Sequence, residues 1–193
     1  VYYDIGITIW ENGHINTLML EGFSIDEIPN NIQNLDSLVH LSFSDNELHN
    51  IPPEIGNLPS LKFLFLSNNH LYGIPEEIGN LNNLEFLHLP GNQLTELPSS
   101  ISNLSNLQSL NIDNNHLTSL SPEITELNSL EYLYIANNEL YEIPINIGAI
   151  SNLKILSAYS NNISEIPSSM GDLSYLFHLD FTNNELVDIP STI

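Results

Sequence analysis

The side chains that most often carry out chemistry are unevenly represented in this sequence. It contains 24 aspartates and glutamates and seven histidines, but two lysines, no arginine and no cysteine. Thiolate nucleophiles, thiolate metal sites and guanidinium clamps are therefore absent. No GxSxG, HExxH or phosphate-binding glycine loop occurs, and abundant carboxylates on an acidic surface do not by themselves form an acid/base pair. We expect no enzyme, no catalytic residue, no metal ligand and no cofactor, although weak Ca²⁺ binding without a dedicated loop stays open.

The formal net charge of −22 restricts the possible partners. Binding to nucleic acid needs clustered lysine and arginine, and anionic membrane surfaces favour the same residues, so neither is an expected partner. The apolar runs are also too short to insert in a membrane, since a span needs about 18 apolar residues or more. A field of this sign would attract a cationic ligand or a basic protein. The alternative is that the charge serves solubility alone.

Aromatic residues are the other side chains that could carry a function. The stretch LKFLFLSNNHL from Leu61 to Leu71 places two of them within a mostly apolar run. Aligning the chain with itself shows what positions them. A unit of 23 residues recurs without insertion or deletion and predicts a solenoid of stacked coils. The units begin at Ile15, Leu38, Leu61, Leu84, Leu107, Leu130, Leu153 and Leu176.

The shared unit reads LxxLxLxxNxLxxIPxxIxxLxx, as in LKFLFLSNNHLYGIPEEIGNLNN. On these residues the chain resembles leucine-rich repeat proteins, over seven full repeats and a partial repeat from residue 176, and so over residues 15–193. The IPxxIGNL half is similar to the 23-residue subclass of Ras-group and bacterial or archaeal surface proteins. The resemblance implies an α/β repeat fold, which is a right-handed horseshoe-shaped solenoid with a parallel sheet on its concave face.

The residues support this architecture independently. The LxL pair alternates with period two, as in a short strand with one buried face. In the second half of each unit, proline lacks a backbone donor and has a fixed φ, which favours a short irregular or single-turn return on the convex side. Two units depart from the pattern: Ser121 stands at the proline position, one residue before Pro122, and Ala158 replaces a large apolar residue of the LxL pair. We interpret both as structural irregularities.

An asparagine recurs shortly after each predicted strand. A short amide can satisfy backbone donors and acceptors where a buried chain turns, so we expect a structural ladder rather than a binding stripe. Asparagines in the same position of leucine-rich repeats do this between adjacent coils, and Phe23 takes the position in the first unit. The predicted ladder is Asn46, Asn69, Asn92, Asn115, Asn138, Asn161 and Asn184.

The residues on either side of the central strand leucine must point to the concave face. Equivalent residues in successive units lie about 4.8 Å apart, so Phe63 should contact Phe86, and Phe65 should contact His88. Two aromatic patches are expected, separated by the smaller Ser109, Asn111 and Asp113. The first patch contains Phe63, Phe65, Phe86 and His88, and the second contains Tyr132, Tyr134, Ile155 and Tyr159.

Exposed aromatic surface of this kind is typical of interfaces. We therefore expect a protein or peptide ligand, possibly cationic, on the concave face, and a function in protein–protein recognition. One alternative is that the aromatics merely suit a pleated surface. Others are a structural or adhesive segment of a larger cell-surface protein that binds glycan, and an intracellular scaffold like the Ras-group proteins. Of the histidines, His70 and His116 lie at equivalent positions two units apart, about 9 to 10 Å, which is too far to share a metal ion.

The two chain ends carry separate expectations. Residues 1–14 should form a capping strand and turn, with a strand from Ile5 to Trp10, an Asn-Gly turn, and Trp10 covering the first coil. This opening is similar to that of prokaryotic surface repeat proteins and, together with the lack of cysteine, favours an extracellular or cell-surface location in a prokaryote. At the other end the last unit is partial and lacks a cap. We expect the native protein to continue or associate end to end there.

Overall fold

The computed structural model describes residues 7–11 and 13–193 of the chain. Within them, one sheet joins nine strands in the order of the sequence, and short 3-10 helices connect them from β2 onward. The strands are β1 (Ile7–Glu11), β2 (His14–Met19), β3 (His40–Ser42), β4 (Phe63–Phe65), β5 (Phe86–His88), β6 (Ser109–Asn111), β7 (Tyr132–Tyr134), β8 (Ile155–Ser157) and β9 (His178–Asp180). The helices are η1 (Asn30–Asn34), η2 (Pro53–Asn57), η3 (Glu76–Asn80), η4 (Ser99–Asn103), η5 (Pro122–Glu126), η6 (Ile147–Ala149) and η7 (Ser168–Asp172).

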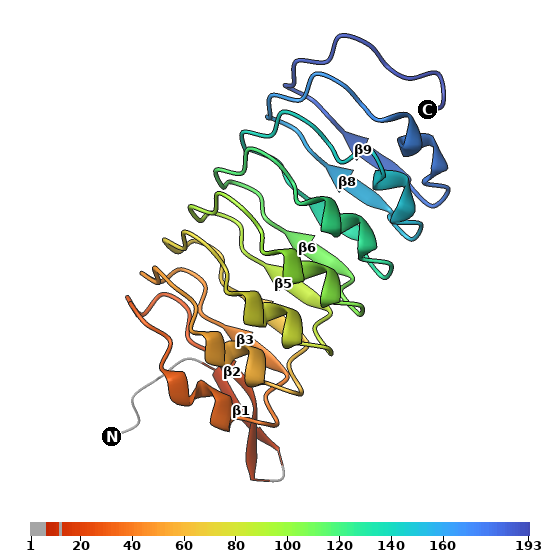
Figure 1. Ribbon diagram of the computed structural model, residues 1–193. Helices are drawn as coiled ribbons and strands as arrows, with labels where there is room; N and C mark the ends of the chain where they lie inside the picture. Colours follow the sequence, from red (N-terminus) through yellow and green to blue (C-terminus); the bar gives the residue numbers. More distant parts are fainter. Residues whose placement is uncertain (1–6, 12) are drawn as a thin grey trace.

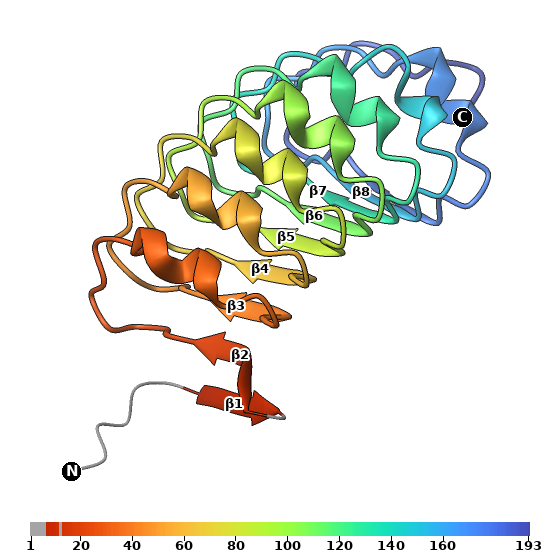
Figure 2. The same ribbon diagram turned by 60° about the horizontal axis from the view of Figure 1, so that its bottom comes forward.

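The coils stack into an open arc, with β1 and β9 at its opposite ends (Figure 1). Strands lie along one side and the 3-10 helices along the other, which Figure 2 shows from a second direction. This arrangement confirms the predicted solenoid with a parallel sheet and a short helical return. Among the described residues, no helix has the length and apolar character that a bilayer span requires.

The predicted hairpin is present at the amino-terminal end of the sheet. Strands β1 and β2 pair antiparallel, with Glu11 opposite His14 beside the turn. Gly13 has a φ of +86°, a conformation that glycine adopts without steric cost. Residues 5 and 6, where the hairpin strand was expected to begin, and the side chain of Trp10, expected to cover the first coil, lie outside the described part of the structure.

From β2 to β9 the strands are parallel and their register advances by one 23-residue unit at every step. Leu64, for example, lies between Leu41 and Leu87. These central leucines are fully buried, and their counterparts continue along the core. Because side chains alternate along a strand, the first and third residues of each strand from β3 to β9 face the concave surface, as do Thr17 and Met19 of β2.

Most of the convex helices directly follow a residue with extended backbone, whereas η6 follows Asn146, at φ −97° and ψ 21°. Pro52, with φ −68° and ψ 144°, precedes η2, and prolines hold similar conformations before η3 and η4. In the fifth unit Ser121 adopts nearly the same conformation, at φ −56° and ψ 130°, and Pro122 begins η5. The displaced proline therefore leaves the turn intact. Ala158, the other irregular residue, is fully buried.

Each asparagine of the ladder bridges two coils. The Oδ1 atom of Asn115 accepts a hydrogen bond from Leu94 N at 2.9 Å, and its Nδ2 donates to Leu89 O at 3.1 Å, both in the preceding coil. Nδ2 also lies 3.0 Å from Ile112 O in its own coil. The pattern repeats from Asn46 to Asn184, so the amides satisfy backbone groups that the stacked turns would otherwise bury unpaired.

A second column, directly before the ladder, holds the left-handed backbone conformation. Its φ is 52° at Asn68, 69° at Gly91 and 56° at Asn114. Glycine, asparagine and aspartate adopt this conformation at lower cost than other residues, and they fill most of the column. The sequence interpretation missed this column, although the residue types were a usable signal. The full column is Gly22, Asp45, Asn68, Gly91, Asn114, Asn137, Ser160 and Asn183.

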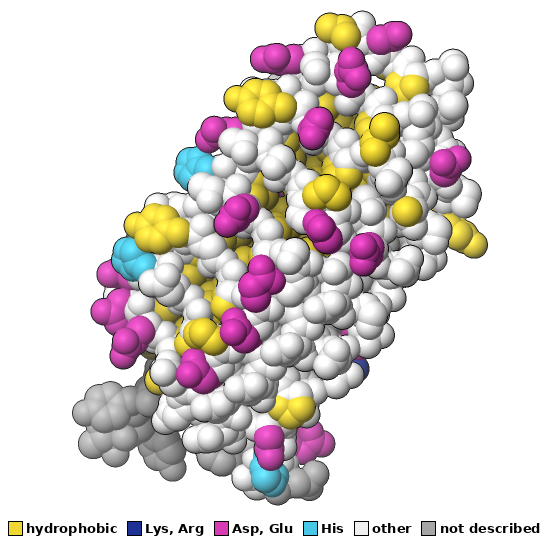
Figure 3. All heavy atoms as spheres, viewed as in Figure 1, with side chains coloured by type: hydrophobic (Ala, Val, Ile, Leu, Met, Phe, Trp, Pro, Cys, Tyr) yellow, Lys and Arg dark blue, Asp and Glu magenta, His cyan; other side chains and the backbone are white. Residues whose placement is uncertain are grey.

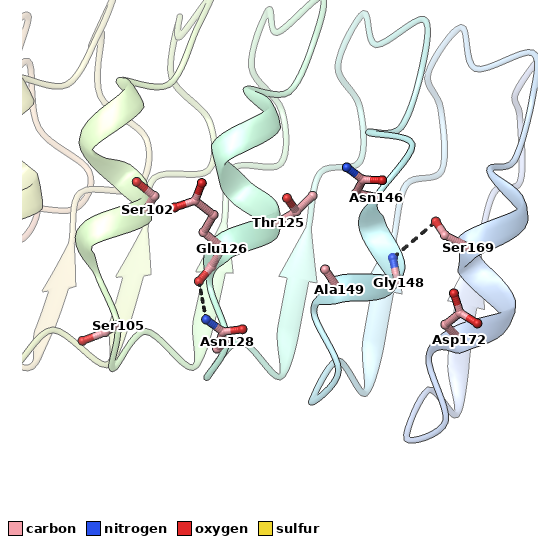
Figure 4. Close-up of a pocket in the computed structure, with 10 residues that line it drawn as sticks. All are labelled: Ser102, Ser105, Thr125, Glu126, Asn128, Asn146, Gly148, Ala149, Ser169 and Asp172. Atoms are coloured by element: carbon pink, nitrogen blue, oxygen red, sulfur yellow. Dashed lines mark hydrogen bonds between the residues drawn. The ribbon is translucent and has the colours of Figure 1, made fainter.

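The convex side is less regular behind the fifth unit. A Cβ atom added to Gly79 would lie 2.5 Å from Ser100 O, so glycine at this position allows the next coil to approach closely. Ser102 and Thr125 occupy the equivalent position in the fourth and fifth units. Their side chains need space that glycine leaves to the neighbouring coil. A hollow of about 660 Å³ lies here, lined by Ser102, Thr125, Asn146 and other small or polar residues (Figure 4).

The last unit is more exposed than those before it. Leu179, Phe181 and Leu186 are partly buried against the core, whereas Val187 is 82 % exposed and Ile193 is 55 % exposed. Self-association through this face stays a prediction.

Candidate functional site

The structure places the strand residues that point away from the core on one open surface, the concave face of the arc. The predicted strand residues are the first or third residue of β4, β5, β7 or β8, and Tyr159 follows β8 by two residues. All eight predicted partner-binding residues are half-buried, because each packs against its neighbours and still reaches the surface.

The first patch is a continuous set of ring contacts. The rings of Phe63 and Phe86 stack with their centroids 5.1 Å apart and an interplanar angle of 22°. Phe65 and His88 lie 5.2 Å apart with a tilt of 50°. Both contacts are those that the register predicted. His40 extends the patch: its ring is parallel to that of Phe63, with centroids 4.2 Å apart.

The residues between the patches are small and tied to the backbone. Ser109 is 3 % exposed, and its Oγ lies 3.0 Å from Nε2 of His88. Asn111 Oδ1 accepts a hydrogen bond from Asp113 N at 3.0 Å. Asp113 Oδ1 in turn accepts one from Ala136 N at 2.6 Å, which holds the carboxyl against the next coil. The first and second patches are therefore separated by one coil of polar side chains.

The second patch differs from the first in how its rings are held. Among the described residues, the ring pairs in contact all lie between His40 and His88, so Tyr132 and Tyr134 do not stack on each other. Tyr159 instead reaches back over the preceding coil, where its Oη lies 3.2 Å from Asn137 Nδ2. Tyr132 pairs in register with Ile155. These side chains offer separate amphipathic surfaces rather than one stack.

Both lysines are engaged by glutamates of a neighbouring coil. Lys62 Nζ lies 2.7 Å from Glu85, and Lys154 Nζ lies 2.7 Å from Glu131. The remaining carboxylates are spread along the molecule, as the face in Figure 3 illustrates. The surface as a whole therefore presents negative charge to an approaching partner.

Three ionisable groups on the concave face, Asp113, His88 and Tyr134, have pKa values shifted by burial. Burial raises the pKa of Asp113 to about 6, against the smaller lowering effect of its hydrogen bond from Ala136. Burial lowers the pKa of His88, so its imidazole is neutral near pH 7. Burial, and then the nearby Tyr132 and Asp113, raise the pKa of Tyr134. Partial burial thus disfavours the charged forms of Asp113, His88 and Tyr134 while no partner is bound.

His49, His70 and His116 lie on exposed surface beyond the strands. His116 Nδ1 lies 3.1 Å from Glu139, and His70 is adjacent to His49, with ring centroids 5.3 Å apart. Within residues 7–11 and 13–193, no three histidine, aspartate or glutamate side chains are grouped as a metal site would require.

Replacing Asp113 with asparagine should stabilise the protein, because asparagine can still accept the Ala136 hydrogen bond but carries no charge. The carboxyl has a pKa of about 6 in the folded chain and about 4 when unfolded, so the cost of ionisation is fully present above pH 6 and disappears towards pH 4. We expect a gain of about 1 kcal/mol at about pH 7.5, allowing for solvent screening. Urea unfolding at several pH values measures it. A gain that does not shrink on acidification would contradict the assignment.

These features define a class of protein, an open repeat solenoid with a parallel sheet along its inner face. The chain belongs to the leucine-rich repeat family. A family model described as a leucine-rich repeat region matches residues 53–142, and a single-repeat model matches residues 37–58 and 152–173. The family and fold are typically those of non-enzymatic interaction modules.

No curated protein sequence matches the chain, but solved structures do. Internalin C2 from Listeria monocytogenes is 30% identical with a TM-score of 0.81, over 90% of this chain and 74% of the internalin. A leucine-rich repeat protein from Leptospira interrogans is 29% identical with a TM-score of 0.51, over 91% of this chain and 56% of that protein.

A plant receptor is also similar. The leucine-rich repeat ectodomain of the membrane receptor kinase GASSHO1/SCHENGEN3 from Arabidopsis thaliana was solved in complex with Casparian strip integrity factor 2. It is 31% identical with a TM-score of 0.75, over 93% of this chain and 25% of the ectodomain. The chain thus spans less than two thirds of the Leptospira and Arabidopsis proteins.

Proposed function

We propose that the concave face binds a partner protein or peptide through the two aromatic patches. The observation that carries this proposal is the ring contact series from His40 through Phe63 to Phe86, half-exposed at the centre of an open face. Aromatic side chains supply large contact area with little loss of conformational entropy, and they dominate binding energy at interfaces. Core packing does not require them there, because the buried leucines of the same strands already fill the core.

The relatives support an interaction module in general, and two finer features are part of the proposal. The first is a cationic partner, because both lysines are paired within the chain and the remaining charge is negative. The second is location at a prokaryotic cell surface. The similarity to a Listeria internalin and to a receptor ectodomain favours a surface or secreted location, and the bacterial relatives agree with the hairpin opening.

An adhesive segment that binds glycan is a second candidate, favoured by the unstacked Tyr132 and Tyr134, whose faces could lie against sugar rings. An intracellular scaffold is supported by the IPxxIGNL half-repeat alone.

The test uses peptides selected on the immobilised protein from a display library of random twelve-residue sequences. The triple variant Phe63→Ala, Phe86→Ala and Tyr132→Ala should fold, with an unchanged circular dichroism spectrum, but bind selected peptides at least about tenfold more weakly, since truncating each central anchor costs about 1 kcal/mol or more.

The matched control replaces three exposed tyrosines away from the patches, Tyr72, Tyr141 and Tyr175, with alanine. It removes the same number of aromatic rings and should leave affinity within about twofold. If the triple variant bound the peptides as tightly as the wild type, the concave face would not be the binding surface. Binding on a glycan array, with no peptide selected, would favour the adhesive alternative.

A further inference from the structure

On the concave face, the carboxyl of Asp113 accepts a hydrogen bond from the described residues with one of its two oxygens. Asp113 lies after β6, and its Oδ1 accepts the hydrogen bond from Ala136 N. Its Oδ2 accepts no hydrogen bond from the described residues, and the carboxyl is only partly exposed. A fixed carboxylate with one free oxygen at the surface is suited to receive a donor from outside the chain.

The residues around this carboxyl come from the next two coils. Ala136, at the equivalent position in the next coil, is fully buried, and its backbone N–H is the donor to Oδ1. Tyr159 occupies that position one coil further on, and its Oη contact with Asn137 carries the phenol back over the coil of Ala136. Tyr134 faces the same surface two residues earlier. We call Asp113, Tyr134, Ala136 and Tyr159 the central notch.

Within residues 7–11 and 13–193, neither lysine supplies a cation to this notch. The two lysines are paired with Glu85 and Glu131, in coils on either side of Asp113. Taking a carboxylate out of water is unfavourable unless an opposite charge compensates it, and burial here raises the pKa of Asp113 to about 6. A cation brought by a partner would remove that penalty, and tyrosine faces would further stabilise it through cation–π contact.

We infer that the partner places a lysine or arginine side chain in the central notch, where it pairs with Oδ2 of Asp113 and lies against Tyr134 and Tyr159. This inference rests on the proposed function. Asp113 lies on the coil between the two patches, so the basic residue should have apolar or aromatic residues before and after it. The strands β4 and β7 are three spacings apart, about 14 Å, which four to five extended residues can cross.

Binding of this kind depends on pH in a defined direction. Asp113 must be ionised, so affinity for a basic segment should fall as the pH drops through 6. The ionisable groups facing it from neighbouring coils are His88 on β5, Tyr132 and Tyr134 on β7, and Tyr159 after β8. Burial raises the pKa of Tyr134, so Tyr134 stays neutral in this range, and protonation of His88 would oppose a cation and so act in the same direction.

The experiment measures peptides selected from the random library against the wild type, Asp113→Asn and Asp180→Asn. Asp180 is the matched control, because it is an aspartate on the same face, it accepts a hydrogen bond from Thr182 N that asparagine can also accept, and it lies outside both patches. We expect a lysine or arginine at one aligned position of the peptides. Asp113→Asn should weaken binding about tenfold, and Asp180→Asn less than about twofold.

A peptide in which methionine replaces the aligned basic residue completes the cycle. This peptide should bind Asp113→Asn and wild type equally. Its affinity should change much less between about pH 7.5 and pH 5 than that of the basic peptide. A structural role for Asp113 would instead weaken both peptides alike.

The outcomes separate the inference from the function on which it rests. If the aromatic triple variant abolishes binding but Asp113→Asn does not, or if the selected peptides share no basic position, the central notch is not a cation site and the proposed function stands. If neither variant affects binding, the concave face is not the binding surface and both fail. Selection of acidic peptides, or glycan binding at the patches, also overturns the inference.

Discussion

Replacing Asn115 with alanine should lower the free energy of unfolding by about 3 to 5 kcal/mol. The amide makes one hydrogen bond to Leu94 N and others to carbonyl oxygens in two coils, and the side chain is 5 % exposed. Alanine would leave the buried Leu94 donor unpaired, which costs about 1 to 3 kcal/mol, whereas Leu89 O would keep its hydrogen bond from Asn92 Nδ2. The lost bonds to carbonyl oxygens add about 0.5 to 1.5 kcal/mol each. Urea unfolding followed by circular dichroism measures the change.

Two further variants calibrate this result. Asn128 is exposed and bonds to one carbonyl oxygen within its own coil, so Asn128→Ala should change stability by less than about 0.5 kcal/mol. Asn184 makes the ladder bonds in the last unit but is only partly buried, so its loss should have an intermediate effect. Equal effects at all three positions would show that burial of the bridged backbone groups is not the source of the stability.

Replacing Gly79 with alanine should cost about 2 kcal/mol. The new Cβ would lie 2.5 Å from Ser100 O and 2.7 Å from Ser100 Cβ, so the backbone of the next coil would have to move. Overpacking of this kind costs about 1 to 3 kcal/mol, more than the gain from restricting the unfolded chain. The measurement is the urea midpoint at constant m-value.

Gly73 supplies the control within the same 23-residue unit. A Cβ there meets no atom within 4 Å, and its φ is not positive. Gly73→Ala should therefore stabilise the protein by about 0.4 to 1 kcal/mol through the unfolded state. If both glycine variants changed stability in the same direction, close approach of the coils could not be the reason for the glycine at position 79.

The contacts that were correctly predicted from the sequence are those that the strand register determines. Once a strand occurs every 23 residues in a parallel sheet, Phe63 must lie beside Phe86 and Phe65 beside His88. Periodicity also fixed which leucines are buried and where the return turns occur. These are properties of spacing, and spacing can be read without knowing side-chain conformations.

What escaped prediction depends on side-chain placement or on backbone conformation. His40 shares the column of Phe63, but its parallel stacking depends on rotamers. Asp113 was expected to be one of several small residues between the patches. Its partial burial and its hydrogen bond from the next coil, which together determine its pKa, were not predicted. The hollow beside Thr125 arises from the spacing of neighbouring coils, which the repeat pattern alone does not give. The binding roles of the patch residues stay predictions.

The missing glycines of the fourth and fifth units have a consequence for the shape of the recognition surface. Strand pairing holds the inner side of the arc at a constant spacing of about 4.8 Å, so extra width at Ser102 and Thr125 on the outer side must appear as curvature. That curvature falls directly behind the coil that separates the two patches. It turns them toward each other, so a ligand that spans both would meet a curved surface rather than a flat one.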